Sequence, residues 1–267
     1  MEATALINPI AFHLGPLAVH WYGVIITGAI GLGIWLAARE AARLGMDPDF
    51  LIDLATWAVP AAIVGARLYQ VFVLEWPYFR THPGEIPAIW QGGLAIHGAV
   101  LAGALVGYIF VRRHRASFWR WADLIAPSLI LGQAIGRWGN FINQEAYGTV
   151  APDWVIRLLP GFIREQMWIE GAYRHPTFLY ESLWNLAVFA LLVWLRRRHP
   201  RQGIIFMTYV GLYSVGRLLI EGIRTDSTFT AGGLRVAQIV SAALIVVAMV
   251  AVAWIQRHVR ERYGEYP

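Results

Sequence analysis

The fold of this chain depends on one stretch, residues 136–148, which reads GRWGNFINQEAYG. A mostly apolar run, residues 128–135, leads into it, and an arginine, two asparagines and a glutamate follow within nine residues. A single arginine at the end of an apolar segment commonly just anchors a helix at the membrane surface. The number and variety of polar groups here favour a site instead. Its first candidates are Arg137, Asn140, Asn143, Glu145 and Gly148.

The composition is that of a membrane protein. Of the 267 residues, 57% are hydrophobic and 15% are charged, whereas a soluble domain carries about 25% charged residues. The chain has no cysteine and no lysine, which excludes thiolate chemistry of its own, a lysine Schiff base and a P-loop. Any fixed positive charge that meets a phosphate must therefore be arginine, whose planar fork suits two-point contacts to phosphate oxygens.

Seven segments are apolar and long enough, at about 20 residues each, to cross a bilayer as helices. They lie near residues 18–38, 50–73, 88–111, 119–138, 178–195, 203–222 and 234–256. The connection 140–177 is too long for a simple loop and too apolar for a disordered tether, so we expect it to fold as a small external cap. The sequence thus predicts an all-α integral membrane protein, a single polytopic domain of residues 1–267 with seven transmembrane helices.

The arginines predict how the chain is oriented. They gather in alternate connections, namely 39–49, 112–118, 196–201 and 257–267. Cytoplasmic loops carry the excess of positive charge in membrane proteins. We therefore expect the N-terminus outside, the C-terminus in the cytoplasm, and the end of the fourth span, at residues 136–148, on the outer side.

Polar side chains from several spans lie at similar depth, close to the outer surface. They are Tyr22, Arg67, His97, Arg137, Tyr180, Glu181, Tyr213, Arg217, Glu221 and Arg224. The last four are spaced by 4, 4 and 3 residues, so they form one stripe on a helix. Ionisable groups in a membrane usually line a bundle interior or an aqueous cavity. This convergence favours a site for an anionic lipid headgroup.

Two of these assignments leave alternatives open. Arg217 and Glu221 could form a pair that only neutralises itself, or Glu221 could orient Arg217 toward a phosphate. In the same way we expect Glu145 to hold Arg137. His97 could be a hydrogen-bonded structural residue or a general base, since the unperturbed pKa of histidine is about 6.5. No His, Asp or Glu grouping has the spacing of a metal site, so we expect no metal and no cofactor. The net charge of +5 lies mostly in loops and does not indicate nucleic-acid binding.

Five motifs, taken together, resemble the bacterial prolipoprotein diacylglyceryl transferases. The first is the opening stretch, Gly136 to Gly148, and the others match in chain order. They are Trp21-Tyr22-Gly23, Gln91-Gly92-Gly93-Leu94 with His97-Gly98, Arg174-His175-Pro176 with Leu179-Tyr180-Glu181, and Tyr213 with Gly216-Arg217, Glu221 and Arg224. The resemblance covers nearly the whole chain.

The resemblance implies a reaction and its partners. The enzyme would transfer the sn-1,2-diacylglyceryl group of phosphatidylglycerol to the lipobox cysteine thiol of a preprolipoprotein, forming a thioether and releasing glycerol phosphate. It would act at the outer side of the bacterial cytoplasmic membrane, among membrane lipids. His97, Arg137 and Arg217 would be catalytic. The substrate-binding residues would be Tyr22, Asn140, Asn143, Glu145, Gly148, Tyr213, Glu221 and Arg224.

Three other functions fit parts of the pattern. A transporter for an anionic solute would also need arginines in its spans, but polar residues should then follow the full depth of the membrane. Another phospholipid-headgroup enzyme would usually carry an acidic metal cluster or a Ser/His arrangement, and neither is visible in the outer layer. A non-catalytic seven-helix receptor is the third alternative.

Overall fold

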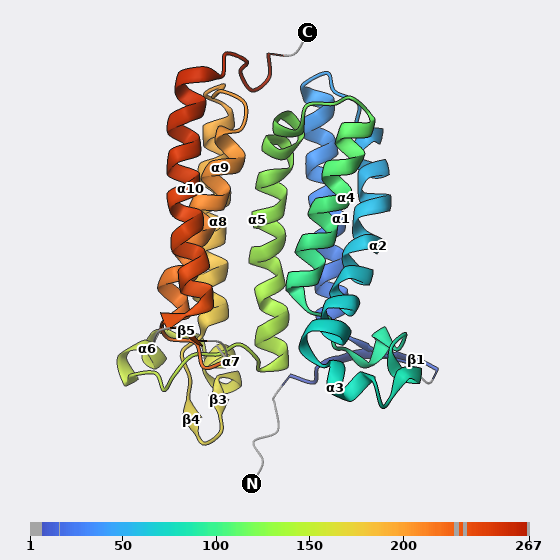
Figure 1. The fold of residues 1–267 in the computed structure, drawn as a ribbon. Helices are drawn as coiled ribbons and strands as arrows, with labels where there is room; N and C mark the ends of the chain where they lie inside the picture. Colours follow the sequence, from blue (N-terminus) through green and yellow to red (C-terminus); the bar gives the residue numbers. More distant parts are fainter. Residues whose placement is uncertain (1–6, 16, 227–229, 232–233, 266–267) are drawn as a thin grey trace. The chain divides into compact units, whose positions relative to one another are not determined.

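The computed structural model describes residues 7–15, 17–226, 230–231 and 234–265, and Figure 1 shows that they are mostly helical. The chain separates into two compact units. The first comprises Met1–Leu36 and Ala122–Pro267, and the second comprises Ala37–Trp121. Two long helices, α1 (Trp21–Arg43) and α5 (Phe118–Asn143), run from one unit into the other.

Six helices within the described residues are long and apolar enough to cross a membrane. They are Trp21–Arg43, Asp49–Leu74, Ile96–Arg113, Thr177–Arg196, Ile204–Glu221 and Val236–His258. Large apolar side chains such as Trp57, Val250 and Trp254 are exposed on their surfaces. Exposed apolar area of this extent is stable against lipid and not against water. The chain is therefore an all-α membrane protein.

The predicted fourth span, residues 119–138, lies within α5, which continues to Asn143. This helix carries Arg120, Asp123 and Arg137 and is not among the six apolar ones. Asp123 is fully buried and caps the start of α9 (Ile204–Glu221): its carboxylate accepts the backbone N–H of Gly203 at 2.6 Å and that of Phe206 at 2.8 Å. A carboxylate is favourable there because the first N–H groups of a helix lack partners.

The first unit is built on α5, α8 (Thr177–Arg196), α9 and α10 (Val236–His258), and α9 packs against both α8 and α10. Ser182 on α8 donates to the carbonyl of Ala134 on α5 at 3.0 Å. Gln133 on α5 donates to the hydroxyl of Tyr209 on α9 at 3.0 Å. Polar contacts such as these link helices whose apolar sides face lipid.

Residues 144–176 fold at one end of these helices (Figure 1). They form α6 (Asp153–Leu158), α7 (Gly161–Gln166) and the hairpin of β3 (Trp168–Ile169) and β4 (Ala172–Tyr173). Their core contains Ile163 and Met167, packed with Phe141 of α5 and Phe178 of α8. Gln166 is fully buried and donates to the carbonyls of Phe141 and Ile142. The segment thus covers the ends of α5 and α8.

Two further hairpins precede membrane helices. β1 (Ile10–Leu14) pairs antiparallel with β2 (Leu17–His20) directly before α1. β5 (Thr230–Ala231) pairs antiparallel with β6 (Leu234–Arg235) directly before α10.

The second unit contains α2 (Asp49–Tyr69), a π-helical turn (Gln70–Leu74), α3 (Trp76–Phe79), two 3-10 turns (Pro83–Glu85 and Ile89–Gln91) and α4 (Ile96–Arg113). The predicted span 88–111 began too early, because Gly92 and Gly93 have φ of 90° and 70° and no helix can pass through them. The backbones of α2 and α4 meet at Gly65 and Gly98, where a β-carbon on either residue would collide with the other helix. These two glycines allow α2 and α4 to pack backbone against backbone.

Candidate active site

The site begins where α5 ends. The N–H of Glu145 donates to the carbonyl of Asn140 at 3.0 Å, and that of Gln144 donates to the carbonyl of Phe141 at 3.2 Å. This pair of bonds is the Schellman arrangement, which requires a left-handed residue after the helix. Gln144 takes that position with φ of 52°, and its side chain is held by the carbonyl of Gln166 at 2.7 Å. A left-handed residue other than glycine is strained, and such strain persists where neighbouring contacts hold the residue in place.

The turn directs Glu145 back along the helix toward two asparagines. Its Oε1 accepts the side-chain N–H of Asn140 at 2.9 Å and that of Asn143 at 3.4 Å. One N–H of each asparagine is used here, and each side chain keeps a second N–H and an oxygen that accepts hydrogen bonds. These three predicted residues therefore form one polar cluster.

The next residues, 146–150, are hydrogen-bonded to two distant parts of the chain. Gly148 donates to the carbonyl of His175 at 3.0 Å, and Thr149 donates to the carbonyl of Ile223 at 2.8 Å. A β-carbon on Gly148 would lie 2.7 Å from that of His175 and 3.0 Å from the oxygen of Ile223. Glycine is required here because three chain segments meet at this point. They connect to the ends of α5, α8 and α9.

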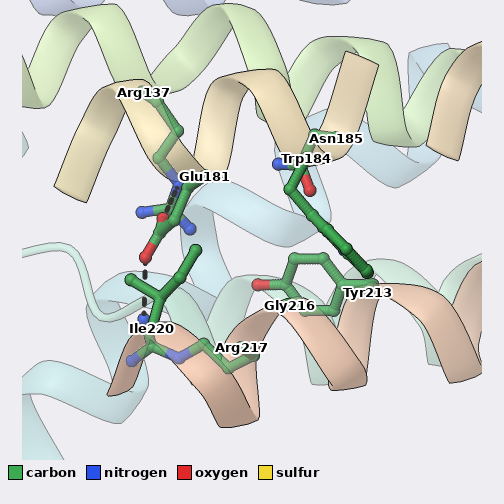
Figure 2. A pocket seen from close by; sticks show the side chains of 8 residues that line it. All are labelled: Arg137, Glu181, Trp184, Asn185, Tyr213, Gly216, Arg217 and Ile220. Atoms are coloured by element: carbon green, nitrogen blue, oxygen red, sulfur yellow. Dashed lines mark hydrogen bonds and ion pairs between the residues drawn. The ribbon is translucent and has the colours of Figure 1, made fainter. Parts of the chain in front are cut away.

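Three arginines gather around one carboxylate in this junction. Glu181, on the first turns of α8, is almost fully buried, and its Oε2 forms an ion pair with Nε of Arg137. Its Oε1 lies 3.5 Å from Nη1 of Arg217 on α9 and 3.1 Å from Nη1 of Arg224 just beyond α9. Figure 2 shows Glu181 between Arg137 and Arg217 at a small hollow, which Trp184, Asn185, Tyr213, Gly216 and Ile220 also line.

Two of the arginines have a second carboxylate. Nη2 of Arg217 lies 2.8 Å from the buried Glu221, so the predicted pair on this helix is present. Arg224 binds Asp226 through Nε at 2.9 Å and Nη2 at 2.5 Å. Burial alone would lower the pKa of Arg224, but Asp226 and Glu181 outweigh it and raise the pKa above its ordinary value. For Asp226, burial would raise the pKa, but the neighbouring Arg224 guanidinium holds the pKa of this carboxyl below its ordinary value.

The two predicted tyrosines lie beside the arginines. Tyr213 lines the hollow with Arg137 and Arg217. Tyr22, at the start of α1, lies within electrostatic range of both Arg137 and Glu145. The ring of Tyr22 packs on Gly139, which lies between Arg137 and Asn140 in the sequence.

His97 belongs to the second unit. It is exposed at the start of α4, with its ring 5.7 Å from that of Tyr69. Arg67 on α2 shapes the chain before it, because its guanidinium donates to the carbonyls of Glu85, Ile86, Gly92 and Gly93 at 2.7 to 3.0 Å. That His97 faces the arginines stays a prediction.

Glu181 was noted among the polar residues of the outer layer but was not predicted to be a site residue. The predicted partner of Arg137 was also wrong: the carboxylate paired with this arginine is Glu181, while Glu145 binds the two asparagines. The turn at Gln144 explains the difference, since it points Glu145 along the helix surface to Asn140. A signal for Glu181 was present, because a carboxylate on an apolar helix needs a buried positive partner.

The fold and this cluster define a class: a multi-pass helical membrane protein with a cluster of arginines and carboxylates at its helix ends. A model of the family described as prolipoprotein diacylglyceryl transferase matches residues 9–254. The chain belongs to this family.

Curated relatives agree over nearly the full length. A protein of Symbiobacterium thermophilum named phosphatidylglycerol–prolipoprotein diacylglyceryl transferase is 53% identical over 261 residues, covering 98% of this chain and 97% of its own. Proteins of the same name are 53% identical over 251 residues in Bacillus velezensis, covering 93% and 92%, and 52% identical over 263 residues in Geobacillus kaustophilus, covering 97% and 96%. These matches favour the transferase over the transporter considered from the sequence.

Proposed function

We propose that this protein transfers the sn-1,2-diacylglyceryl group of phosphatidylglycerol to the lipobox cysteine thiol of a preprolipoprotein. Sulfur forms a bond to the glycerol carbon that carries the phosphate, and the carbon–oxygen bond to the phosphate breaks. The products are a thioether-linked lipoprotein precursor and glycerol phosphate. The family and the names of the relatives support this reaction.

The observation that carries the proposal is the cluster of Arg137, Arg217 and Arg224 around Glu181. Negative charge builds up on the departing phosphate in the transition state, and fixed positive groups stabilise such charge best when they are already in place. The carboxylates hold the arginines in place before the substrate arrives. Tyr22 and Tyr213 lie where their hydroxyls could donate to phosphate oxygens.

The cluster of Asn140, Asn143 and Glu145 fits the other part of the headgroup. Its remaining oxygens accept hydrogen bonds, and the terminal glycerol of phosphatidylglycerol offers two hydroxyl donors. Asn140 lies three residues after Arg137 on α5, so the two side chains are neighbours on the helix surface. A phosphate at Arg137 would therefore place the glycerol near the asparagines. Gly148 supports this arrangement by allowing the loop to pack closely.

A base must remove the proton from the substrate thiol, whose pKa is about 8.5 in a free cysteine. His97 is our candidate, either directly or through a water molecule. No cysteine of the enzyme is needed, because the thiol belongs to the substrate. We expect the reaction to require no metal or cofactor.

We further propose how the protein is oriented in the membrane. The protein spans the bacterial cytoplasmic membrane seven times, with α5 as the fourth span. Its N-terminus is external and its C-terminus cytoplasmic, as the distribution of arginines predicts. The segment 144–176 is an external cap, and the site lies toward the outer side, where lipoprotein precursors emerge.

The direct test incubates the purified protein with phosphatidylglycerol and a peptide that contains a lipobox, and follows the peptide mass. We expect the mass to rise by one diacylglyceryl group and glycerol phosphate to appear in equal amount. The matched control is the same peptide with Cys→Ser at the lipobox. An unchanged peptide mass would show that the proposed function is wrong, and modification of the serine peptide would show that the thiol is not the acceptor.

A further inference from the structure

Three helices of the first unit each bring one residue to the hollow of Figure 2 and carry a neutral polar residue one turn farther from the helix end. The pairs are Arg137 with Gln133 on α5, Glu181 with Asn185 on α8, and Tyr213 with Tyr209 on α9. Residues four apart share a helix face and are separated by about 6 Å along the axis. We call Gln133, Asn185 and Tyr209 the neutral layer.

Asn185 is a buried amide without a hydrogen-bond partner. Its residue is only 3% exposed, and it lines the hollow together with Tyr213, as Figure 2 shows. In the part of the chain that the structure describes, no group pairs with its side chain. An amide carries two donor hydrogens and an acceptor oxygen, and leaving these unpaired away from water is costly. An unpaired amide at a hollow therefore indicates a ligand.

Gln133 and Tyr209 are bonded to each other and still have groups to spare. Nε2 of Gln133 donates to the hydroxyl of Tyr209 at 3.0 Å. Within the described residues, the hydroxyl hydrogen has no acceptor and the buried Oε1 of Gln133 has no donor. A bond that only joins two helices needs one donor and one acceptor. The ring of Tyr209 lies 6.2 Å from that of Tyr213, so this pair continues the polar surface of the hollow inward.

The chemistry along the three helices changes in the same order as that of a phospholipid. One turn beyond the neutral layer, the residues at the next four-residue step are apolar: Leu129, Phe189 and Ile205. Each helix thus passes from the arginine site through an uncharged polar residue to an apolar one. A phospholipid passes from its phosphate through its ester groups to its fatty chains. The neutral layer, which has no charge for a second phosphate, matches the esters.

We infer that the neutral layer binds the ester carbonyls of the diacylglyceryl group. This inference rests on the proposed function and names a further part of the lipid that the site recognises. An ester carbonyl accepts hydrogen bonds and donates none. Asn185 and Tyr209 supply the donors at this depth, and Gln133 holds Tyr209 in place. The layer selects lipids with ester-linked chains over lipids with ether-linked chains, since an ether has no carbonyl oxygen.

The experiment is a competition between two lipids. The full-length protein in detergent micelles receives a lipobox peptide and equal amounts of two phosphatidylglycerols, one with ester-linked and one with ether-linked chains of equal length. The two products differ in mass, and their ratio does not depend on how much of the protein is folded. We expect the unaltered protein to favour the ester lipid about 3- to 10-fold, the effect of one hydrogen bond.

Two variants remove donors of the layer while keeping the size of the side chain. Asn185→Leu and Tyr209→Phe should each bring the product ratio toward one. Tyr213→Phe is the matched control: its hydroxyl lies one turn nearer the arginines, so its loss should slow both lipids alike and leave the ratio unchanged. Since Asn185 has no hydrogen-bond partner among the described residues, Asn185→Leu should not lower the melting temperature.

A ratio near one for the unaltered protein would overturn the inference, and so would a ratio that stays unchanged in both Asn185→Leu and Tyr209→Phe. Retention of the two lipids by each protein is measured in parallel by native mass spectrometry, which needs no transfer reaction. If the unaltered protein modifies no peptide, the proposed function is wrong, and the ratio of retained lipids still decides the role of the neutral layer.

Discussion

The ring of Tyr22 lies directly on Gly139, so that a β-carbon at position 139 would come within 2.6 Å of the ring carbon Cδ2. This contact places the start of α1 against α5 one turn before the end of α5. Since Arg137 lies two residues before Gly139 and Asn140 directly after it, the tyrosine packs on the part of α5 that carries both polar clusters of the site.

Replacing this glycine should misplace the tyrosine. We expect Gly139→Ala to lower the rate of diacylglyceryl transfer at least about tenfold, because small displacements in a preorganised site are costly. Gly132→Ala is the matched control on the same helix, since a β-carbon there meets nothing within 4 Å. Rates are compared by peptide mass spectrometry at equal protein concentration. Equal activity of the two variants would show that the contact does not matter for the site.

Arg137→Lys tests the requirement for a fork. Lysine keeps the positive charge but offers a single ammonium in place of two coplanar donors. We expect transfer to fall about 10- to 100-fold, while the melting temperature in detergent changes little. Arg164→Lys on α7, an exposed arginine outside the site, should remain as active as the unaltered protein. Near-normal turnover of Arg137→Lys would contradict a two-point contact to the phosphate.

His97→Gln should remove the general base and leave the fold intact, because the side chain is exposed at the start of α4. At neutral pH we expect a large loss of transfer. As the pH rises toward the thiol pKa of about 8.5, the substrate ionises unaided and activity should return. A rate–pH profile between pH 6 and 9 measures this. Full activity at neutral pH would remove His97 from the mechanism.

The stability of the protein should depend on pH through His175. Burial lowers the pKa of this imidazole below its ordinary value, so the folded state favours the neutral form. The unfolded chain then binds more protons between the folded pKa and about 6.5, and stability falls as the pH drops through that window. We expect the melting temperature to fall between pH 7.5 and pH 5.5, and to fall less in His175→Asn. An identical pH dependence of both proteins would contradict this.

Much of the fold could be predicted because the membrane imposes it. Apolar length alone located the six helices that are apolar enough to cross a bilayer, and the spacing of Arg217 and Glu221 predicted their pair, since residues four apart on a helix are neighbours. The start of the third span was placed too early because Gly92 and Gly93 resemble ordinary small residues of a membrane helix until their left-handed conformation is seen.

The position of the Glu181 carboxylate among the arginines was harder to predict, because it depends on how the helices pack against one another. Arg137 and Glu181 are far apart in sequence, and they meet only because Ser182 and Gly216 set how α8 contacts α5 and α9. Glu145 lies much nearer than Glu181 to Arg137 in the sequence and carries the same carboxylate group, so it was the expected partner of Arg137. Only the left-handed turn at Gln144 turns it toward Asn140 instead.

The bond between Thr149 and Ile223 also constrains when the protein can become active during its synthesis. The loop after α5 is completed by residues that follow α9, so a growing chain that has inserted only its first helices carries Arg137 without its counter-ion and Gly148 without its neighbours. The arginine cluster around Glu181 is therefore complete only once the residues that follow α9 have been made.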